Sequence, residues 1–253
     1  MKGCAMKRLI FLLFLLLGTA FSESMYATYK IEYGIFGKMG VSDAYLSKKD
    51  GRYEIKMVAK ATGLAKVLSG GRVEIYGSRG KIVDGRLIPD RFTKDIKRSN
   101  KRRIKVYTFD HEAKKVVFHE KNFRDDKLKD EKNETLPYYA DNDILSLYFN
   151  VAAIIGSCDN PFAKDLKAVG AEKKTGRVRV ETITGEDAKK LGKSLGEEPC
   201  YLKVTIFQKL FGSKGGELYL SMDENFVVQK ALLKDVIMFG DIRGKLTSFE
   251  YKK

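Results

Sequence analysis

Histidine, cysteine, proline and tryptophan are all scarce in this chain of 253 residues, which has 2 His, 3 Cys, 4 Pro and no Trp. So few His and Cys disfavour zinc clusters, disulfide scaffolds and His-based nucleophilic triads. What is present is 43% hydrophobic, 11% aromatic and 32% charged residues, a composition typical of a folded globular protein. The 48 basic residues outnumber the 33 acidic ones, and the formal net charge is +15.

The N-terminus has the layout of a secretory signal peptide. Lys2, Lys7 and Arg8 precede an apolar run of about 13 residues, and small residues follow it. This run is too short to span a bilayer, which takes roughly 20 residues, so we expect cleavage after Ala20 or Ser22. The sequence therefore predicts residues 1–22 as a signal peptide and a periplasmic mature chain. Loss of three basic residues leaves that chain a formal charge of about +12.

Two cysteines, Cys158 and Cys200, remain after the predicted cleavage. In an oxidising compartment such a pair favours one disulfide, which stabilises a loop of this length by roughly 4 kcal/mol. Two buried, unpaired thiols are the alternative.

Most of the mature chain shows the period-2 alternation of half-buried strands. In residues 26–33, apolar and polar side chains alternate, and the same pattern recurs in 52–59, 71–76, 103–109, 116–119, 178–183, 201–207, 217–222 and 246–251. The sequence therefore predicts a mainly β fold: an antiparallel, partly open barrel-like or sandwich-like sheet. One amphipathic helix is expected over 143–155, with Asp141 or Asp143 as N-cap and Gly156 at its end.

Residues 23–253 are expected to form a single β-rich domain. Its two possible halves, 23–123 and 143–253, would be joined by a surface linker, because residues 124–134 are almost wholly charged. A second polar stretch, 185–199, is interpreted as a loop with one helical turn at 187–191.

Several short motifs, in this order, resemble one known family. They are Gly34, Gly37 and Gly40 after a Tyr-rich strand, then Gly51-Arg52-Tyr53, Leu87-Ile88-Pro89, Asp143-Ile144-Leu145-Ser146-Leu147-Tyr148-Phe149 and Leu218-Tyr219-Leu220-Ser221-Met222-Asp223. Over roughly residues 26–251 the chain is similar to a bacterial family of exported proteins catalogued only as a domain of unknown function. The resemblance implies a β-rich periplasmic or envelope-associated domain, and it carries no catalytic residues.

The sequence contains no convincing catalytic or metal motif. Residues 192–196 spell Gly-x-Ser-x-Gly, but Ser194 lacks the flanking apolar strand and a downstream His. His111 and His119 lie near the two ends of a predicted hairpin, where two solvated side chains are favoured over a metal site. Because neither phosphate-binding loop nor dinucleotide fingerprint is present, we predict no catalytic residue, metal or cofactor.

The strongest charge anomaly is the basic segment 94–105. Outside the cytoplasm the abundant polyanions are lipid head groups and acidic glycans, so export argues against nucleic acid as the partner. The candidate residues for contact with an anionic surface are Lys97, Arg98, Lys101, Arg102, Arg103 and Lys105. A plain solvated hairpin is the alternative interpretation.

These observations predict a binding protein whose partners are an envelope lipid or other amphiphile and an anionic membrane surface. An envelope enzyme without a recognisable motif, or a structural or protein-interaction module, are the alternatives. The sequence does not specify an oligomeric state.

Overall fold

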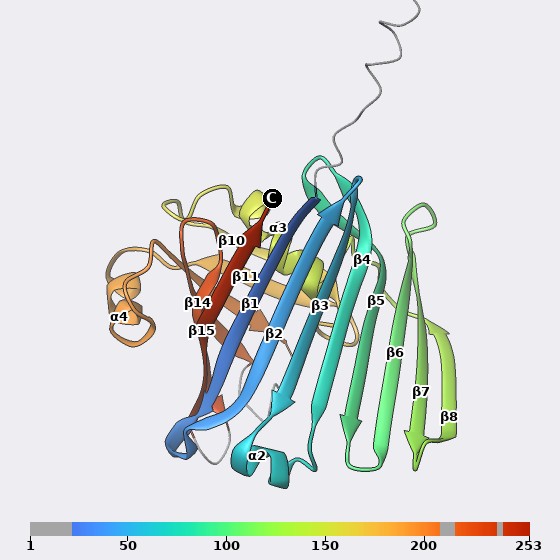
Figure 1. Cartoon of the computed structure of the whole chain (residues 1–253). Helices are drawn as coiled ribbons and strands as arrows, with labels where there is room; N and C mark the ends of the chain where they lie inside the picture. Colours follow the sequence, from blue (N-terminus) through green and yellow to red (C-terminus); the bar gives the residue numbers. More distant parts are fainter. Residues whose placement is uncertain (1–21, 208–215, 237–239) are drawn as a thin grey trace, which may run out of the picture.

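A single large β-sheet dominates the computed structural model, which describes residues 22–207, 216–236 and 240–253 (Figure 1). Its fifteen strands lie in the order β8-β7-β6-β5-β4-β3-β2-β1-β15-β14-β13-β12-β11-β10-β9. The strands are β1 (Ser22–Tyr33), β2 (Lys38–Lys49), β3 (Arg52–Ala61), β4 (Val73–Val83), β5 (Arg86–Arg98), β6 (Lys101–Asp110), β7 (Lys115–Arg124), β8 (Lys127–Thr135), β9 (Asn142–Asp143), β10 (Ala163–Val169), β11 (Arg177–Thr182), β12 (Cys200–Ile206), β13 (Glu217–Met222), β14 (Val228–Val236) and β15 (Gly240–Lys252). The helices are η2 (Gly34–Phe36), α2 (Gly63–Leu68), α3 (Ile144–Ile155) and α4 (Gly185–Leu195).

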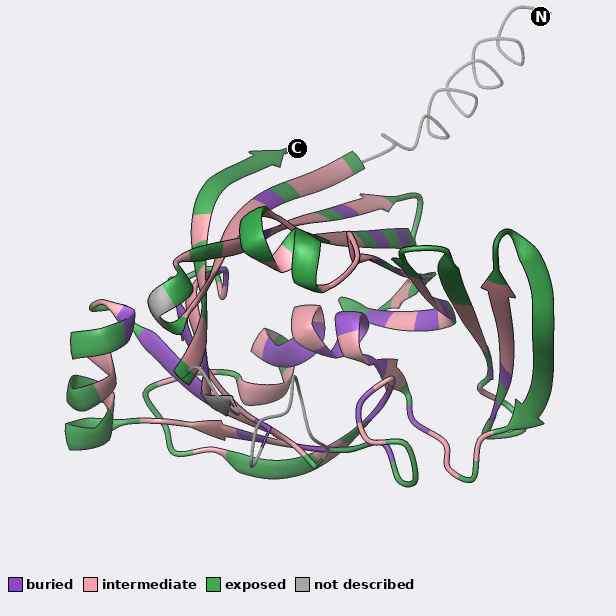
Figure 2. Cartoon of the chain, turned by 90° about the horizontal axis from the view of Figure 1, so that it is seen from below, coloured by how far each residue is buried: buried purple, intermediate pink, exposed green. Residues whose placement is uncertain are grey.

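The sheet is strongly curved, and α3 lies on its concave side (Figure 2). Neighbouring strands are antiparallel except for the short parallel pair β9 and β10. The predicted fold class, an antiparallel and partly open barrel-like sheet with one inserted helix, is confirmed.

Helix α3 begins and ends where the sequence predicts. Asp143 is the N-cap, and its carboxylate accepts hydrogen bonds from the backbone N–H groups of Leu145 and Ser146. Ser146 returns the interaction by accepting from the Asp143 N–H, which completes a capping box. Gly156 ends the helix with a positive φ of 78°, a conformation that favours glycine.

The helix connects two parts of the hydrophobic core. Leu145 belongs to a cluster with Phe92, Phe109 and other side chains of the first strands. Val151, further along α3, belongs to a second cluster built on β11 to β14. A helix that is buried on several sides in this way holds the two regions of the curved sheet together.

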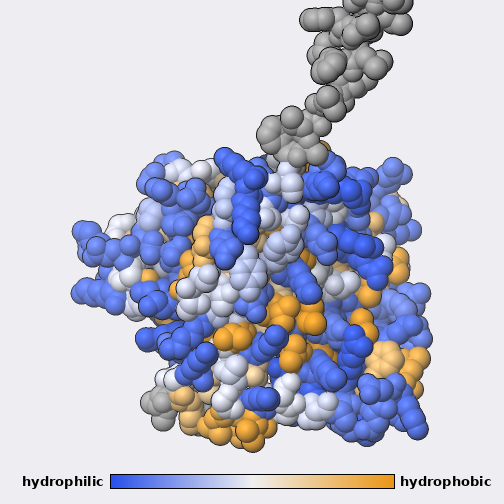
Figure 3. All heavy atoms as spheres, viewed as in Figure 1, coloured by the Kyte–Doolittle hydropathy of each residue, from blue (hydrophilic) through white to orange (hydrophobic). Residues whose placement is uncertain are grey.

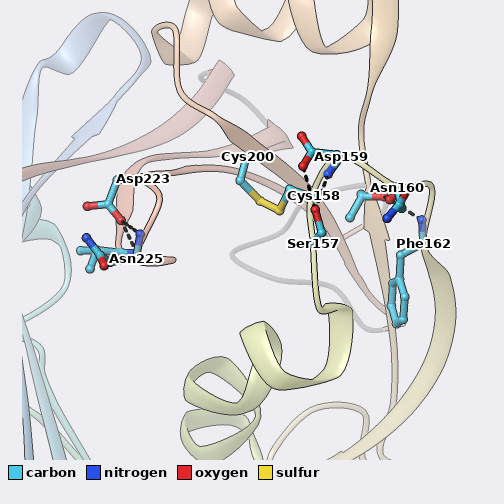
Figure 4. The surroundings of a disulfide bond; sticks show 10 residues. Ser157, Cys158, Asp159, Asn160, Phe162, Cys200, Asp223 and Asn225 are labelled. Atoms are coloured by element: carbon cyan, nitrogen blue, oxygen red, sulfur yellow. Dashed lines mark hydrogen bonds between the residues drawn. A yellow bond between two sulfur atoms is a disulfide. The ribbon is translucent and has the colours of Figure 1, made fainter.

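The predicted disulfide between Cys158 and Cys200 is formed (Figure 4). It joins the segment after α3 to the first residue of β12, with the two Cα atoms 5.4 Å apart. Cys200 is only 3% exposed, so this cross-link is part of the second core cluster. A disulfide is consistent with an oxidising compartment.

Two predictions about polar segments are wrong. The charged stretch predicted as a linker forms most of β8, which pairs with β7 at the edge of the sheet. Every residue of β8 is exposed, and a strand wetted on both faces shows no alternation of apolar and polar residues. Residues 185–195 form the complete helix α4 instead of a loop with one turn.

Residues 1–21 of the predicted signal peptide lie outside the described residues, and Ser22 is the first residue of β1. Within the described ranges, no helix has the length and apolar character needed to cross a membrane.

Candidate anion-binding groove

Four basic residues form a lateral row across four consecutive strands. Arg98 of β5 lies opposite Lys101 of β6, Lys101 lies opposite Arg124 of β7, and Arg124 lies opposite Lys127 of β8. Neighbouring strands are about 4.8 Å apart, so each positive charge has another as its nearest cross-strand neighbour. We call these four residues the basic row.

Like charges directly opposite each other destabilise a sheet unless an anion lies between them. None of the four residues of the basic row forms an ion pair with a described acidic side chain. Asp125, in the turn between β7 and β8, accepts a hydrogen bond from Asn100 instead. Within the described part of the chain, the row is therefore a cluster of basic side chains without a direct ion pair, although Asp125 and Asp126 lie in the turn between Arg124 and Lys127.

The row borders a groove of about 880 Å³ at one end of the sheet. Arg98, Lys101 and Arg124 have the same strand parity as the core residues Phe92, Phe109 and Val116, which places them toward the concave side. Eleven residues line the groove, and one of them, Asp130, is acidic. Its basic lining residues are Arg72, Arg98, Lys101, Arg102, Arg103, Arg124 and Lys129. Ile96 and Phe123 add an apolar component.

Further along the concave face the charges are compensated. Lys105 forms an ion pair with Glu120 at 2.9 Å, and Arg103 lies 3.5 Å from the same carboxylate. Although Glu120 is partly buried, its hydrogen bonds from Lys105 and Asn122 and the nearby charges hold the pKa of its carboxyl below the usual value. Arg103 lines the groove as well, so the basic row differs from its neighbours on this face in having no direct ion partner among the described residues.

Lys94 lies deeper still on the same face. Its ammonium group stands 4.9 Å from the centre of the Tyr76 ring, and burial lowers the pKa of this Lys. Tyr76 donates a hydrogen bond to Glu74, which also pairs with Arg72 at the groove. A polar chain thus runs from the groove lining into the first core cluster.

The structure separates the predicted surface residues into three groups. Arg98, Lys101, Arg102 and Arg103 line the groove. Lys97 has the opposite strand parity from Arg98, and Lys105 belongs to the compensated region next to Glu120. Arg102 also donates from Nε and Nη2 to the Asp95 carboxylate, so its charge is partly neutralised.

Sequence reasoning missed the contributions of Arg72, Arg124, Lys127 and Lys129. Arg124 and Lys127 belong to the stretch interpreted as a linker. Acidic residues are interleaved with basic ones there, so the stretch does not stand out as a basic segment. Only the register of β6, β7 and β8 brings them beside Lys101. The signal available in the sequence was a basic residue on each side of two tight turns, Ser99-Asn100 and Asp125-Asp126.

The two histidines do not come together. His111 contacts the Tyr139 hydroxyl at 2.6 Å and the Pro89 carbonyl at 2.8 Å, whereas His119 contacts Glu131 at 2.5 Å. In the described ranges, no three His, Cys, Asp or Glu side chains gather where they would hold a metal ion. Ser194 lies in α4, and its hydroxyl donates to the Leu191 carbonyl within the same helix.

A buried polar cluster joins α3 to the sheet. The Ser78 hydroxyl donates to the Asp143 carboxylate at 2.5 Å and lies 2.9 Å from the Tyr53 hydroxyl. All three residues are at most 3% exposed, so a substrate in solution does not reach them. Burial raises the pKa of Asp143 to about 6. This cluster serves to position the helix cap.

The sequence model of a family described as "Protein of unknown function (DUF3108)" matches residues 28–247. Among solved structures, the crystal structure of a beta-barrel-like protein of domain of unknown function DUF1849 from Brucella abortus is similar, with 12% sequence identity and a TM-score of 0.44. That match covers 92% of this chain and 98% of the other. No curated protein matches.

Proposed function

This chain belongs to the DUF3108 family of proteins of unknown function, and we propose that it is a periplasmic binding protein for anionic amphiphiles. In this proposal the groove receives a phosphate-bearing head group, and the basic row docks the protein on an anionic membrane surface. The observation that carries the proposal is the row of cations without a direct ion pair formed by Arg98, Lys101, Arg124 and Lys127.

The chemistry of the lining suits a lipid head group. Arg side chains donate in a planar fork that matches phosphate oxygens, and Lys101 supplies a mobile point charge. Ile96 and Phe123 offer apolar contacts next to these donors. An amphiphile, which joins an anion to a hydrocarbon part, matches this combination better than a small inorganic ion.

The size of the effect follows from membrane electrostatics. Each Lys or Arg near an anionic bilayer contributes about 1 kcal/mol at moderate ionic strength. Four residues in the basic row therefore supply roughly 4 kcal/mol, about a thousandfold in the partition coefficient. Because solvated charges are screened within about 10 Å at 0.1 M salt, binding should weaken steeply as salt rises.

Co-sedimentation with vesicles tests this function. The probe is a phosphatidylcholine vesicle with about a third phosphatidylglycerol, compared with pure phosphatidylcholine. We expect Lys101→Glu/Arg124→Glu to bind the anionic vesicles at least tenfold more weakly than the wild type. The matched control is Lys81→Glu/Arg86→Glu, which makes the same charge change at exposed residues flanking the turn at the opposite end of the sheet.

Two outcomes would overturn the proposal. In the first, the wild type does not distinguish anionic from neutral vesicles. In the second, the control variant loses as much binding as Lys101→Glu/Arg124→Glu, which would reduce the effect to overall net charge.

A further inference from the structure

Helix α2 exposes an apolar surface that the fold does not cover. Leu64, Val67 and Leu68 are 49%, 77% and 71% exposed, and no residue of α2 is buried. Val67 and Leu68 are the two most exposed large apolar side chains in the described part of the chain. Side chains in such positions contribute little to folding, so their apolar character requires another explanation.

The charged residues in the chain segment that contains α2 are all basic. The segment from Lys60 to Arg72 includes Lys66 and contains no acidic residue. Lys66 lies in the last turn of α2, directly before the exposed Val67 and Leu68. An apolar tip in a segment whose charged residues are all basic has the chemistry of a helix that enters the interface of an anionic bilayer.

This tip lies at the same end of the sheet as the groove. The turns of η2 and α2 occupy the lower end of Figure 1, where β5 ends and β6 begins. Figure 3 shows a group of apolar side chains at the lower edge of this face, in addition to apolar side chains in its middle and toward its right edge. Figure 2, seen from below, shows α2 exposed toward the viewer.

Backbone contacts fix the tip next to the groove lining. The Ser99 N–H, in the turn between β5 and β6, donates to the Gly70 carbonyl at 2.7 Å. Gly70 has a φ of +66°, and a Cβ there would lie 2.1 Å from the Ser99 hydroxyl oxygen, so only glycine fits this close approach. Ser99 lies between Arg98 and Lys101 of the basic row in sequence. The apolar tip and the row are therefore held at neighbouring positions.

We propose that α2 is a membrane-inserting tip: Val67 and Leu68, supported by Leu64, enter the acyl region of an anionic bilayer while the basic row contacts its head groups. This inference rests on the proposed function, because the row supplies the electrostatic attraction that brings the tip to the surface. A tip of six residues reaches the boundary between head groups and acyl chains, roughly 5–10 Å deep, without spanning the membrane.

Because the chain contains no Trp, a single introduced Trp can report insertion by its fluorescence without background from other Trp residues. Leu68→Trp places a single Trp in the tip, and Val83→Trp places one at an exposed apolar position beside the turn at the opposite end of the sheet. Both variants are mixed with vesicles that contain a third phosphatidylglycerol and phosphatidylcholine brominated on its acyl chains. We expect the Leu68→Trp emission to shift to the blue and to be quenched at least twofold, with the Val83→Trp emission unchanged.

Insertion and docking have separate measurements, so their failures are distinguishable. Co-sedimentation of Leu68→Trp without a blue shift or quenching would overturn the inserting tip and leave the proposed function intact. Failure of both variants and the wild type to sediment with anionic vesicles would overturn the proposed function and the tip together. Equal quenching of the two variants would show that the tip has no special orientation, which also overturns the inference.

Two double variants that remove exposed apolar side chains provide a second test, with vesicle binding as the measurement. We expect Val67→Ser/Leu68→Ser to lower partition into anionic vesicles about tenfold or more, because two exposed apolar side chains no longer enter hydrocarbon. Val83→Ser/Val117→Ser removes two other half-exposed valines and should change partition less than twofold. Unchanged binding by the tip variant would contradict the inference.

Discussion

Lys101 of β6 lies directly opposite Arg124 of β7, and both cations line the same groove. An isolated sheet gains nothing from this arrangement, because like charges in facing positions repel. Arg98 on one side and Lys127 on the other extend the repulsion over four strands. The arrangement becomes favourable when an anion occupies the groove, and this relationship links the stability of the sheet to its proposed ligand.

Reversing one charge of the row should therefore affect stability and binding in opposite directions. We expect Lys101→Glu to raise the free energy of unfolding by up to about 1 kcal/mol, because Glu would face Arg98 and Arg124. In a domain of this size that corresponds to a rise of roughly 2–4 °C in Tm. Thermal unfolding at low salt without lipid measures it. The same variant should bind anionic vesicles more weakly, and a fall in Tm would contradict the repulsion.

The Asp143 carboxyl should make stability depend on pH. Burial raises its pKa to about 6 in the folded state, compared with about 3.9 in an unfolded chain. The neutral form is favoured by folding, so this stabilisation is complete below about pH 4 and is lost as pH rises through about 6. Relative to Asp143→Asn, we expect the wild type to lose roughly 2 kcal/mol between pH 4 and 7 in urea unfolding.

Asp143→Asn is a conservative probe because its amide retains an oxygen for the Leu145 and Ser146 N–H groups. Its NH₂ group faces the Ser78 hydroxyl, which accepts the new hydrogen bond by rotating. Asp143→Ala removes the cap altogether and should cost about 1–2 kcal/mol at every pH. Parallel pH profiles for the wild type and Asp143→Asn would show that another group is responsible.

The Cys158–Cys200 disulfide should contribute strongly to stability. Its cysteines are 42 residues apart in sequence, and the chain-entropy model assigns a loop of this size about 4 kcal/mol. We expect Cys158→Ser/Cys200→Ser to lower the free energy of unfolding by that order. The variant should also be insensitive to dithiothreitol, whereas the wild type should lose stability when reduced. Equal stability with and without reductant in the wild type would contradict a structural role.

Asn150 should be essential for attaching α3 to β5. Its side chain accepts from the Leu87 N–H at 2.8 Å and donates to the Leu87 carbonyl at 2.9 Å. Both residues are at most 3% exposed, so Asn150→Ala leaves two buried backbone groups without partners and should cost about 2–4 kcal/mol. Asn133→Ala, on the exposed strand β8, should change stability by less than about 0.5 kcal/mol in the same urea titration.

The helix and its surroundings show where sequence reasoning succeeds and where it stops. The cap at Asp143 and the stop at Gly156 are local signals, and both are observed. The polar contacts of α3 are not local: Asp143 accepts from Ser78 across 65 positions, and Asn150 bonds Leu87 across 63. Hydrogen bonds between residues so far apart produce no periodic pattern in the sequence, so they cannot be predicted from it.

The sequence by itself determined the alternating strands, the inserted helix and the cysteine pair. The strands and the helix follow from the periodic spacing of apolar residues, and the disulfide follows from the presence of only two cysteines after the predicted cleavage site. The tertiary structure alone decided that β8 is a strand and that Lys101 faces Arg124 and Arg98. The physical reason is that strand register, set by backbone hydrogen bonds and tight turns, places residues distant in sequence side by side. The composition indicates a basic protein. The strand register places some of its basic residues together along a groove, next to the apolar tip.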